Sequence, residues 1–222
     1  NFALKPASSD NYELGLKSQN PFGLFTLAVF QTDTKNDIVT AGTRDCRATF
    51  RNADQTTRQG LELSWQQTIW KQLNIQSSFS YIDAEFDSYT AEIANPDDST
   101  KPYAKAINKG NKIPGIAKNQ AFTRIAWQPE QGFQAGLEAR YMDKIYVDDI
   151  NSDTAPSYTV LAANVGYLWV NRDWKVNSYA RVDNLFDRNY VGSVIVNDGN
   201  SRFFEPVDGR NFSVGMSVTK AF

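Results

Sequence analysis

The chain has 222 residues, of which 23 are Lys or Arg and 25 are Asp or Glu, so its formal net charge is −2. This balance gives no basic surface of the kind that binds nucleic acid. The chain has no histidine and one cysteine, Cys46, which excludes His-dependent catalytic triads, imidazole metal sites and a disulfide within the chain. Aromatic residues make up 13%, and rings in such number favour a membrane interface or the binding of saccharides or chelates.

The first third of the chain predicts three strands. Apolar residues alternate with polar or small ones in 12–17 and again in 58–67, which is the period of a strand with one apolar face. Between them, 24–32 is a strand with apolar residues in both parities, so its faces stay unassigned. Residues 33–56 are polar and charged and predict a long loop.

The middle of the chain repeats the pattern. Strands are predicted at 72–81, 120–128 and 133–141. The segment 87–118, rich in Asp, Asn, Lys, Gly and Pro, predicts a second long loop, whereas 129–132 predicts a tight turn.

The last third predicts three more strands. The 18 residues 154–171 carry no charge, but they contain Pro156 and Gly166 and their apolar residues alternate, so we expect a strand rather than a membrane helix. Strands at 174–183 and 212–218 follow, separated by a long loop over 184–209. The chain ends on an aromatic residue, Phe222.

Two regularities favour a transmembrane β-barrel. Short turns alternate with long loops, as in bacterial outer-membrane barrels, where the short turns are periplasmic and the long loops extracellular. All five tryptophans fall beside the short turns, which gives half of an aromatic girdle; they are Trp65, Trp70, Trp127, Trp169 and Trp174. We therefore expect an all-β, antiparallel, up-and-down barrel segment with about nine strands.

The face of the predicted strands opposite the apolar one carries charges and amides, which suits a barrel lumen that is filled with water or a plug. Nine strands are an odd number, and a sheet of nine strands has two open edges. The segment is therefore expected to be the C-terminal portion of a larger barrel.

Several short motifs, in order along nearly the whole chain, resemble one family. They are 12–17 (YELGLK), 57–64 (TRQGLELS), 113–115 (IPG), 146–149 (YVDD) and 182–187 (VDNLFD) with Tyr190. Together with Phe222 they resemble the C-terminal barrel of TonB-dependent outer-membrane receptors. The resemblance implies a 22-stranded barrel, residues 1–222 as its C-terminal portion, and an N-terminal plug and earlier strands that precede this segment.

The same resemblance implies the function. Such receptors import a scarce nutrient, most often a ferric siderophore, with energy from the TonB complex acting through the plug. The implied partners are this chelate, the TonB complex, outer-membrane lipids and the barrel assembly machinery, which is expected to recognise Phe222. No cofactor, no resident metal, no catalytic residue and no nucleic-acid partner are expected, and the location is the bacterial outer membrane.

The long loops are expected to hold the ligand, because anionic aromatic chelates are bound by cations and ring faces. The candidates are Arg44, Arg47, Tyr89, Tyr103, Arg202 and Phe203. Basic loop residues can instead be solvated or contact lipid phosphates. The pair Asp148 and Asp149 could hold a hard cation, although the start of a turn is the favoured interpretation.

Three alternatives remain at this point. One is an outer-membrane enzyme, which the absence of histidine disfavours, another is a porin-like channel, and the third is a soluble β-sandwich binding module.

Overall fold

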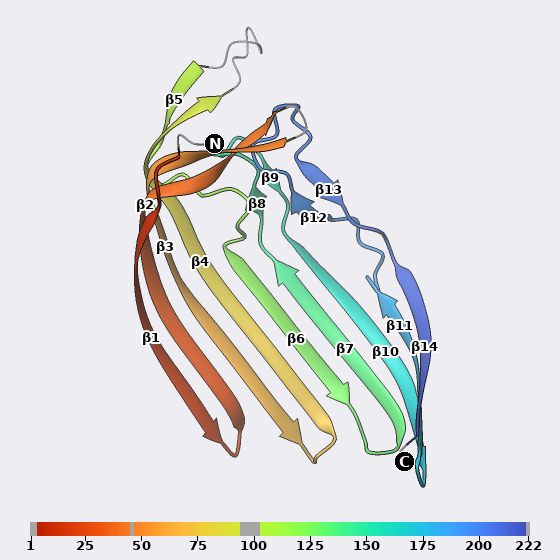
Figure 1. Ribbon diagram of the computed structural model, residues 1–222. Coiled ribbons are helices and arrows are strands. Elements are labelled where there is room, and N and C mark those ends of the chain that lie inside the picture. Colours follow the sequence, from red (N-terminus) through yellow and green to blue (C-terminus); the bar gives the residue numbers. More distant parts are fainter. Residues whose placement is uncertain (1–3, 45–46, 94–102, 221–222) are drawn as a thin grey trace.

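The structure is a computed structural model that describes residues 4–44, 47–93 and 103–220. Its main sheet follows the order β1-β2-β3-β4-β6-β7-β10-β11-β14, and every neighbouring pair is antiparallel. The nine strands run side by side in a curved, tilted wall (Figure 1). They are β1 (Ser8–Asn20), β2 (Gly23–Arg44), β3 (Arg47–Ile69), β4 (Leu73–Ile93), β6 (Asn119–Trp127), β7 (Gly132–Met142), β10 (Tyr158–Asn171), β11 (Trp174–Asp183) and β14 (Asn211–Lys220).

The remaining strands are short and lie in the long connections. Strand β5 (Tyr103–Ile107) pairs with β4, β8 (Ile145–Tyr146) pairs with β9 (Thr154–Ala155), and β12 (Val191–Val194) pairs with β13 (Phe204–Pro206). Within the described residues, no helix is long and apolar enough to cross a membrane. The meander of nine strands and the strand assignment of the uncharged segment near 154–171 are therefore confirmed.

All short turns lie at one end of the wall and all long connections at the other (Figure 1). The tryptophans lie at the end with the short turns, as expected. Trp65, the one farthest along its strand from a turn, donates its Nε1–H to the Phe22 carbonyl at 2.8 Å and stacks on Phe25 with ring centroids 6.0 Å apart. Amphipathic rings of this kind suit a membrane interface, so this end has one half of an aromatic girdle.

Strand register gives the wall two chemically different faces. One row of register partners joins Leu16, Leu27, Leu63 and Phe79, and a second joins Ile75, Ile125, Leu137, Ala163, Val182 and Phe212. We call the face that holds these rows the outer face and the opposite one the inner face. The pairing also assigns the ambiguous strand 24–32, whose Phe25, Leu27 and Val29 point outward.

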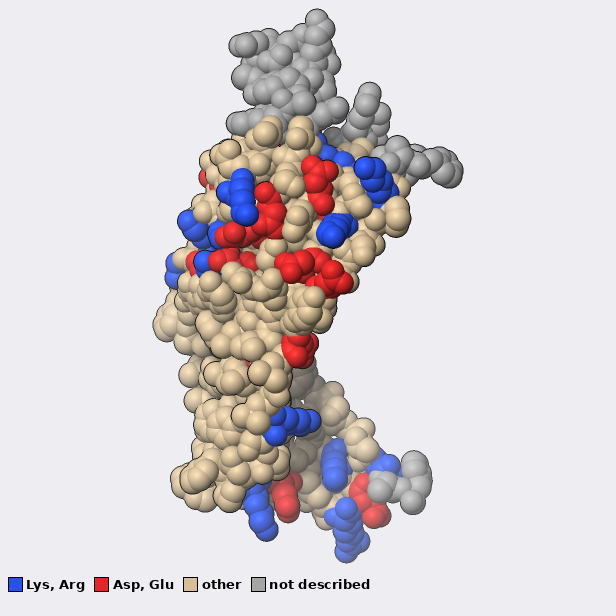
Figure 2. Space-filling view, turned by 90° about the vertical axis from the view of Figure 1, so that its left-hand side faces the viewer, with Lys and Arg blue, Asp and Glu red and all other residues tan. Residues whose placement is uncertain are grey.

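Charge is distributed as a membrane-spanning wall requires. A space-filling view of the β1 side shows Lys, Arg, Asp and Glu gathered at the two ends, with an almost uncharged band between them (Figure 2). Leu63, in the outer rows, has 44% of its surface exposed although it is apolar and lies within a strand of the sheet. An exposed apolar band of this extent is typical of a surface that meets lipid.

The prediction that 33–56, 87–118 and 184–209 are loops throughout is wrong, and the hairpin of β12 and β13 lies in the third of them. Strand β2 continues to Arg44, β3 begins at Arg47, β4 continues to Ile93, and β5 pairs with its end. The register shifts between Thr40 and Gly42 on β2, and again where Gln55 and Thr56 face Ser88 and Phe86 on β4. Each irregularity moves the following side chains to the other face, so the alternation visible in sequence is interrupted.

The extended strands and connections form a structured cap, which we call the crown: residues 33–44, 47–57, 82–93, 103–118, 143–157 and 184–210. It contains a buried apolar cluster of Val39, Ala53, Ala84, Phe86, Tyr89, Ala91, Ile107 and Ile113. Phe86 is fully buried and stacks on Tyr89 with ring centroids 4.9 Å apart. The crown therefore has its own core, above the band that meets lipid.

Candidate ligand-binding face

The inner face ends, beneath the crown, in a cavity of about 110 Å³. Arg140 of β7, Phe122 of β6, and Tyr190 and Asp208 of the connection between β11 and β14 line it. Arg140 is exposed, and its guanidinium makes no hydrogen bond or ion pair with any residue that the structure describes. A cation beside ring faces in a concave site is suited to anionic or aromatic ligands.

The connection over residues 184–210 is held together by hydrogen bonds between its side chains and its backbone. Asn184, at φ 51°, accepts the Arg188 N–H at 2.9 Å and donates to the Arg188 carbonyl at 2.8 Å. The Asp187 carboxylate accepts the Arg210 N–H at 2.8 Å, which joins the start of the connection to its end. Tyr190 then packs on Tyr158, with ring centroids 4.3 Å apart. Asn184 and Asp187 are thus structural residues.

Glu138, Arg181 and Asp183 also line this cavity, and their charges are paired. Glu138 accepts both terminal nitrogens of Arg181, at 3.1 and 2.8 Å, and lies 3.5 Å from Arg124 Nε. Arg181 also contacts Asp183 at 2.8 Å. The contact between Glu138 and Arg181 joins β7 and β11, the two strands on either side of β10. Ala162 of β10, the register partner of Glu138, is small enough to leave room for it. Arg181 is thus paired with carboxylates, whereas Arg140, on the same cavity, makes no hydrogen bond or ion pair with a residue that the structure describes.

A junction in the crown joins three connections to one another. The Asn197 side chain donates to the Thr40 carbonyl at 2.7 Å and to Asp149 Oδ1 at 3.0 Å, and its Oδ1 accepts the Asp149 N–H at 3.1 Å. Gly42 makes this approach possible: its φ is 123°, and a Cβ there would stand 2.6 Å from the Asn197 carbonyl oxygen. The junction therefore fixes the crown above the inner face.

Buried ionisable groups surround the junction. Asp149 has 2% of its surface exposed and its Oδ2 lies 3.5 Å from Arg51 NH2. Burial raises the pKa of Asp149, and the Asn197 hydrogen bond and the Arg51 charge offset only part of the effect. Burial, together with the Asp149 charge, likewise raises the pKa of Tyr89.

The comparisons with known proteins agree with this architecture. A family model described as "TonB dependent receptor-like, beta-barrel" matches residues 1–185. The chain belongs to this family. The family consists of receptors and transporters rather than enzymes, and its members are outer-membrane β-barrel proteins.

Curated relatives of this TonB-dependent receptor barrel are named as a siderophore receptor and a ferrioxamine receptor. The probable TonB-dependent siderophore receptor PiuA of Acinetobacter baumannii is 26% identical over 193 residues, which cover 86% of this chain and 24% of that protein. The ferrioxamine receptor of Yersinia enterocolitica is 27% identical over 197 residues, with 86% and 25% coverage. The chain thus spans about a quarter of the length of the curated relatives that it matches.

Solved structures share the fold. The siderophore receptor PiuA from Acinetobacter baumannii superimposes with a TM-score of 0.74 at 24% identity, covering 96% of this chain and 28% of that one. BauA, the ferric preacinetobactin receptor from the same species, gives a TM-score of 0.70 at 20% identity, with 95% and 29% coverage.

The sequence-predicted site residues of this receptor barrel lie at different places in the crown. Arg44 ends β2 and Arg47 begins β3, and the two are register partners at the tip of that hairpin; Tyr103 begins β5. The side chains of these three residues lie outside the described part of the structure, as does Phe222.

The other three candidates have described side chains. Tyr89 is 3% exposed and belongs to the crown core. Arg202 is exposed and its N–H donates to Asp198 at 2.9 Å, while Phe203 is partly buried and meets Phe204 edge-on at 6.4 Å. The pair Asp148 and Asp149 starts a turn, in which the Asp148 carboxylate accepts the Ser152 N–H at 2.8 Å.

Sequence reasoning did not single out Arg140 as a candidate site residue. Its parity placed it on the inner face, but nothing in the sequence distinguishes it from Arg181, because the distinction depends on which carboxylates lie within reach.

Proposed function

We propose that this chain is the C-terminal portion of an outer-membrane receptor that binds a ferric siderophore and imports it. The observation that carries the proposal is that the chain belongs to the TonB-dependent receptor barrel family. Its sheet agrees with this, because it has an apolar outer face and a polar inner face beneath a structured crown. The names of the sequence relatives, a siderophore receptor and a ferrioxamine receptor, support the ligand class.

The remaining parts of the receptor belong to the same proposal. Earlier strands close the barrel against β1 and β14, since an open sheet edge in lipid leaves backbone groups without partners. A plug precedes those strands, fills the lumen and contacts the TonB complex, which supplies the energy. The barrel assembly machinery recognises the C-terminal strand through Phe222, and outer-membrane lipids surround the outer face.

The proposed ligand site combines the crown tips with the cavity on the inner face. Arg44, Arg47, Tyr103, Arg202 and Phe203 stay as proposed ligand contacts. Arg140 and Tyr190 join them, because the guanidinium makes no ion pair with a described carboxylate and the ring lines the same cavity. Tyr89 supports the site from the crown core instead of contacting ligand.

The test is equilibrium binding of a panel of ferric siderophores, hydroxamate and catecholate, to the complete receptor in detergent. We expect one member to bind, and Arg140→Gln to weaken it by about 1.5–3 kcal/mol, the usual contribution of a hydrogen bond to a charged group. Lys175→Gln is the matched control, because Lys175 is an exposed inner-face cation beside the short turns, far from the cavity. Binding of no ferric chelate, or equal loss in both variants, would contradict the proposed site.

A further inference from the structure

The inner-face cavity beneath the crown has an apolar wall next to a carboxylate. Val160, Ala162 and Val207 line it together with Asp208. Its volume of about 110 Å³ is well below the roughly 300–1,000 Å³ of pockets that enclose a whole drug-sized ligand. The cavity therefore has room for one arm of a ferric chelate rather than for the entire complex.

Asp208 is the carboxylate of this cavity for which the structure describes no partner. Glu138 and Asp183, the other carboxylates that line it, both contact Arg181. Asp208 is exposed and makes no hydrogen bond or ion pair with a described residue. A carboxylate beside an apolar wall is suited to a protonated amine on an alkyl chain, because the methylene groups meet the wall and the ammonium meets the charge.

The cavity also offers ring faces and a separate cation. Phe122 and Tyr190 line it, and ring faces attract an ammonium ion. Arg140 comes from β7, whereas Asp208 lies in the segment just before β14, and β10 and β11 lie between those two strands. A ligand can therefore place an ammonium against Asp208 and oxygen acceptors against Arg140.

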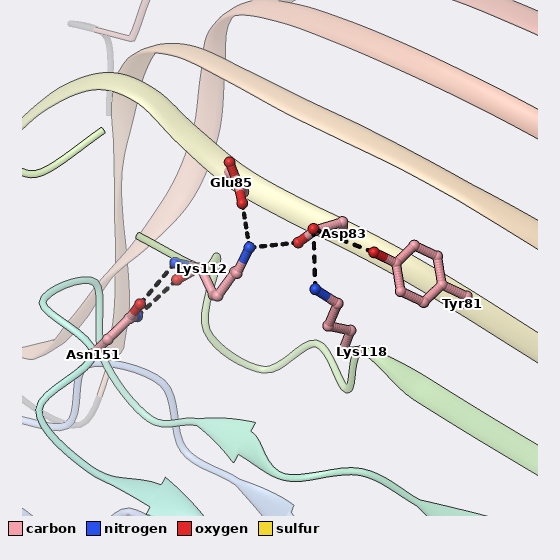
Figure 3. Close-up of polar contacts among 6 residues, drawn as sticks. All are labelled: Tyr81, Asp83, Glu85, Lys112, Lys118 and Asn151. Atoms are coloured by element: carbon pink, nitrogen blue, oxygen red, sulfur yellow. Dashed lines mark hydrogen bonds and ion pairs between the residues drawn. The ribbon is translucent and has the colours of Figure 1, made fainter. Parts of the chain in front are cut away.

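The crown adds no excess of positive charge around this cavity. Figure 3 shows lysines of the crown that are paired with carboxylates: Lys112 Nζ lies 2.6 Å from Asp83 Oδ1 and also contacts Glu85, and Lys118 Nζ lies 3.1 Å from Asp83 Oδ2. In the connections that follow β7 and β11, carboxylates outnumber cations. They are Asp143, Asp148, Asp149 and Asp153 against Lys144 in 143–157, and Asp187, Asp198, Glu205 and Asp208 against Arg188, Arg202 and Arg210 in 184–210. Surroundings of this sign disfavour a strongly anionic ligand.

We propose that this cavity binds the protonated amine arm of the imported chelate, and that the chelate is a ferric tris-hydroxamate with a terminal amine. Asp208 accepts the ammonium, Val160 and Val207 contact the methylene chain, and Arg140 donates to hydroxamate oxygens. Three hydroxamates neutralise one ferric ion, so the ammonium makes this chelate singly positive, whereas three catecholates leave a triply negative complex. The inference rests on the proposed import function, and its ligand differs in charge from the anionic chelates expected from the basic loop residues alone.

The experiment measures equilibrium binding of three probes to the complete receptor in detergent: a linear ferric tris-hydroxamate with a terminal amine, the same chelate with that amine acetylated, and a ferric tris-catecholate. The wild type should bind the amine form roughly tenfold or more tightly than the acetylated form. Asp208→Asn should abolish this preference, and Asp208→Glu should keep it. The control Asp173→Asn, at an exposed site in the turn between β10 and β11, should show the same preference as the wild type.

Equal affinity of the wild type for the amine and acetylated forms, or an unchanged preference in Asp208→Asn, would overturn the inference. Tighter binding of the tris-catecholate than of both hydroxamates would also overturn it, while leaving the proposed import of a ferric siderophore standing. The heat-dependent gel shift of the folded barrel verifies that each variant folds. Failure to bind any ferric chelate, in this set or in the wider panel, would instead refute the proposed function.

Discussion

Replacement of Leu63 by arginine tests the assignment of the two faces. Leu63 lies near the centre of the part of β3 below the crown, residues 58–69, between Leu27 and Phe79 in the outer rows, and 44% of its surface is exposed. An arginine at the bilayer midplane of a barrel costs about 2–4 kcal/mol, and the cost falls toward the interfaces. Leu63→Arg should therefore lower the free energy of unfolding of the complete barrel in a bilayer by about 2–4 kcal/mol.

Glu62 supplies the matched control. It is the preceding residue on the same strand, faces the lumen, is exposed, and makes no hydrogen bond or ion pair with the described residues. Glu62→Arg should change the free energy of unfolding by less than about 1 kcal/mol, as for an exposed surface substitution. Glu138 is a poor control, because Arg181 and Arg124 contact it. The assay is denaturant unfolding in lipid vesicles, and equal losses at Leu63 and Glu62 would refute the assignment of the faces.

The remaining predictions concern the crown and assembly. Gly42→Ala places a Cβ 2.6 Å from the Asn197 carbonyl oxygen at a positive φ, which should destabilise the folded crown by about 1–3 kcal/mol. Limited proteolysis should therefore cleave the crown of this variant faster while the barrel stays folded, and an unchanged rate of cleavage would argue against the junction. Because the pKa of Asp149 is raised in the folded state, its protonated form stabilises the crown at acid pH, and this contribution is lost as the pH rises through the raised pKa. Hydrogen-exchange protection at Asn197 should thus be greater at acid than at neutral pH, and Asp149→Asn should remove the difference; protection that increases with pH would contradict this. Deletion of Phe222 should lower the amount of receptor in the outer membrane on immunoblots, and an unchanged amount would exclude its role in assembly.

Much of the wall could be predicted from the sequence, because alternation and turn residues are local signals. Leu61, Leu63 and Trp65 on one face of 58–67, for example, give the strand and its orientation directly. Strand 24–32 resisted assignment because Phe30 and Ala28 are apolar on the lumen side, so only pairing with β3 decides its faces. Local patterns fail where both faces of a strand are apolar.

The crown could not be predicted for a different reason. Its strands contain buried polar residues, such as Thr34 and Thr56, and the register irregularities near Ala41 and Asp87 shift the alternation in mid-strand. The contact of Asn197 with Thr40 spans 157 positions, so no local pattern indicates it. Arg140 makes no ion pair with a described residue, and this too depends on the tertiary arrangement, which places Glu138 against Arg181 and Arg124 of other strands.

The most direct test of the central claim is energised uptake of iron. A strain that lacks the receptor, complemented with the complete gene, should accumulate radiolabelled iron from the ferric siderophore that binds in vitro. Accumulation should stop when TonB is removed or the inner membrane is de-energised, and Arg140→Gln should reduce it while Lys175→Gln does not. Uptake that is equal with and without the receptor, or that continues without TonB, would contradict the account.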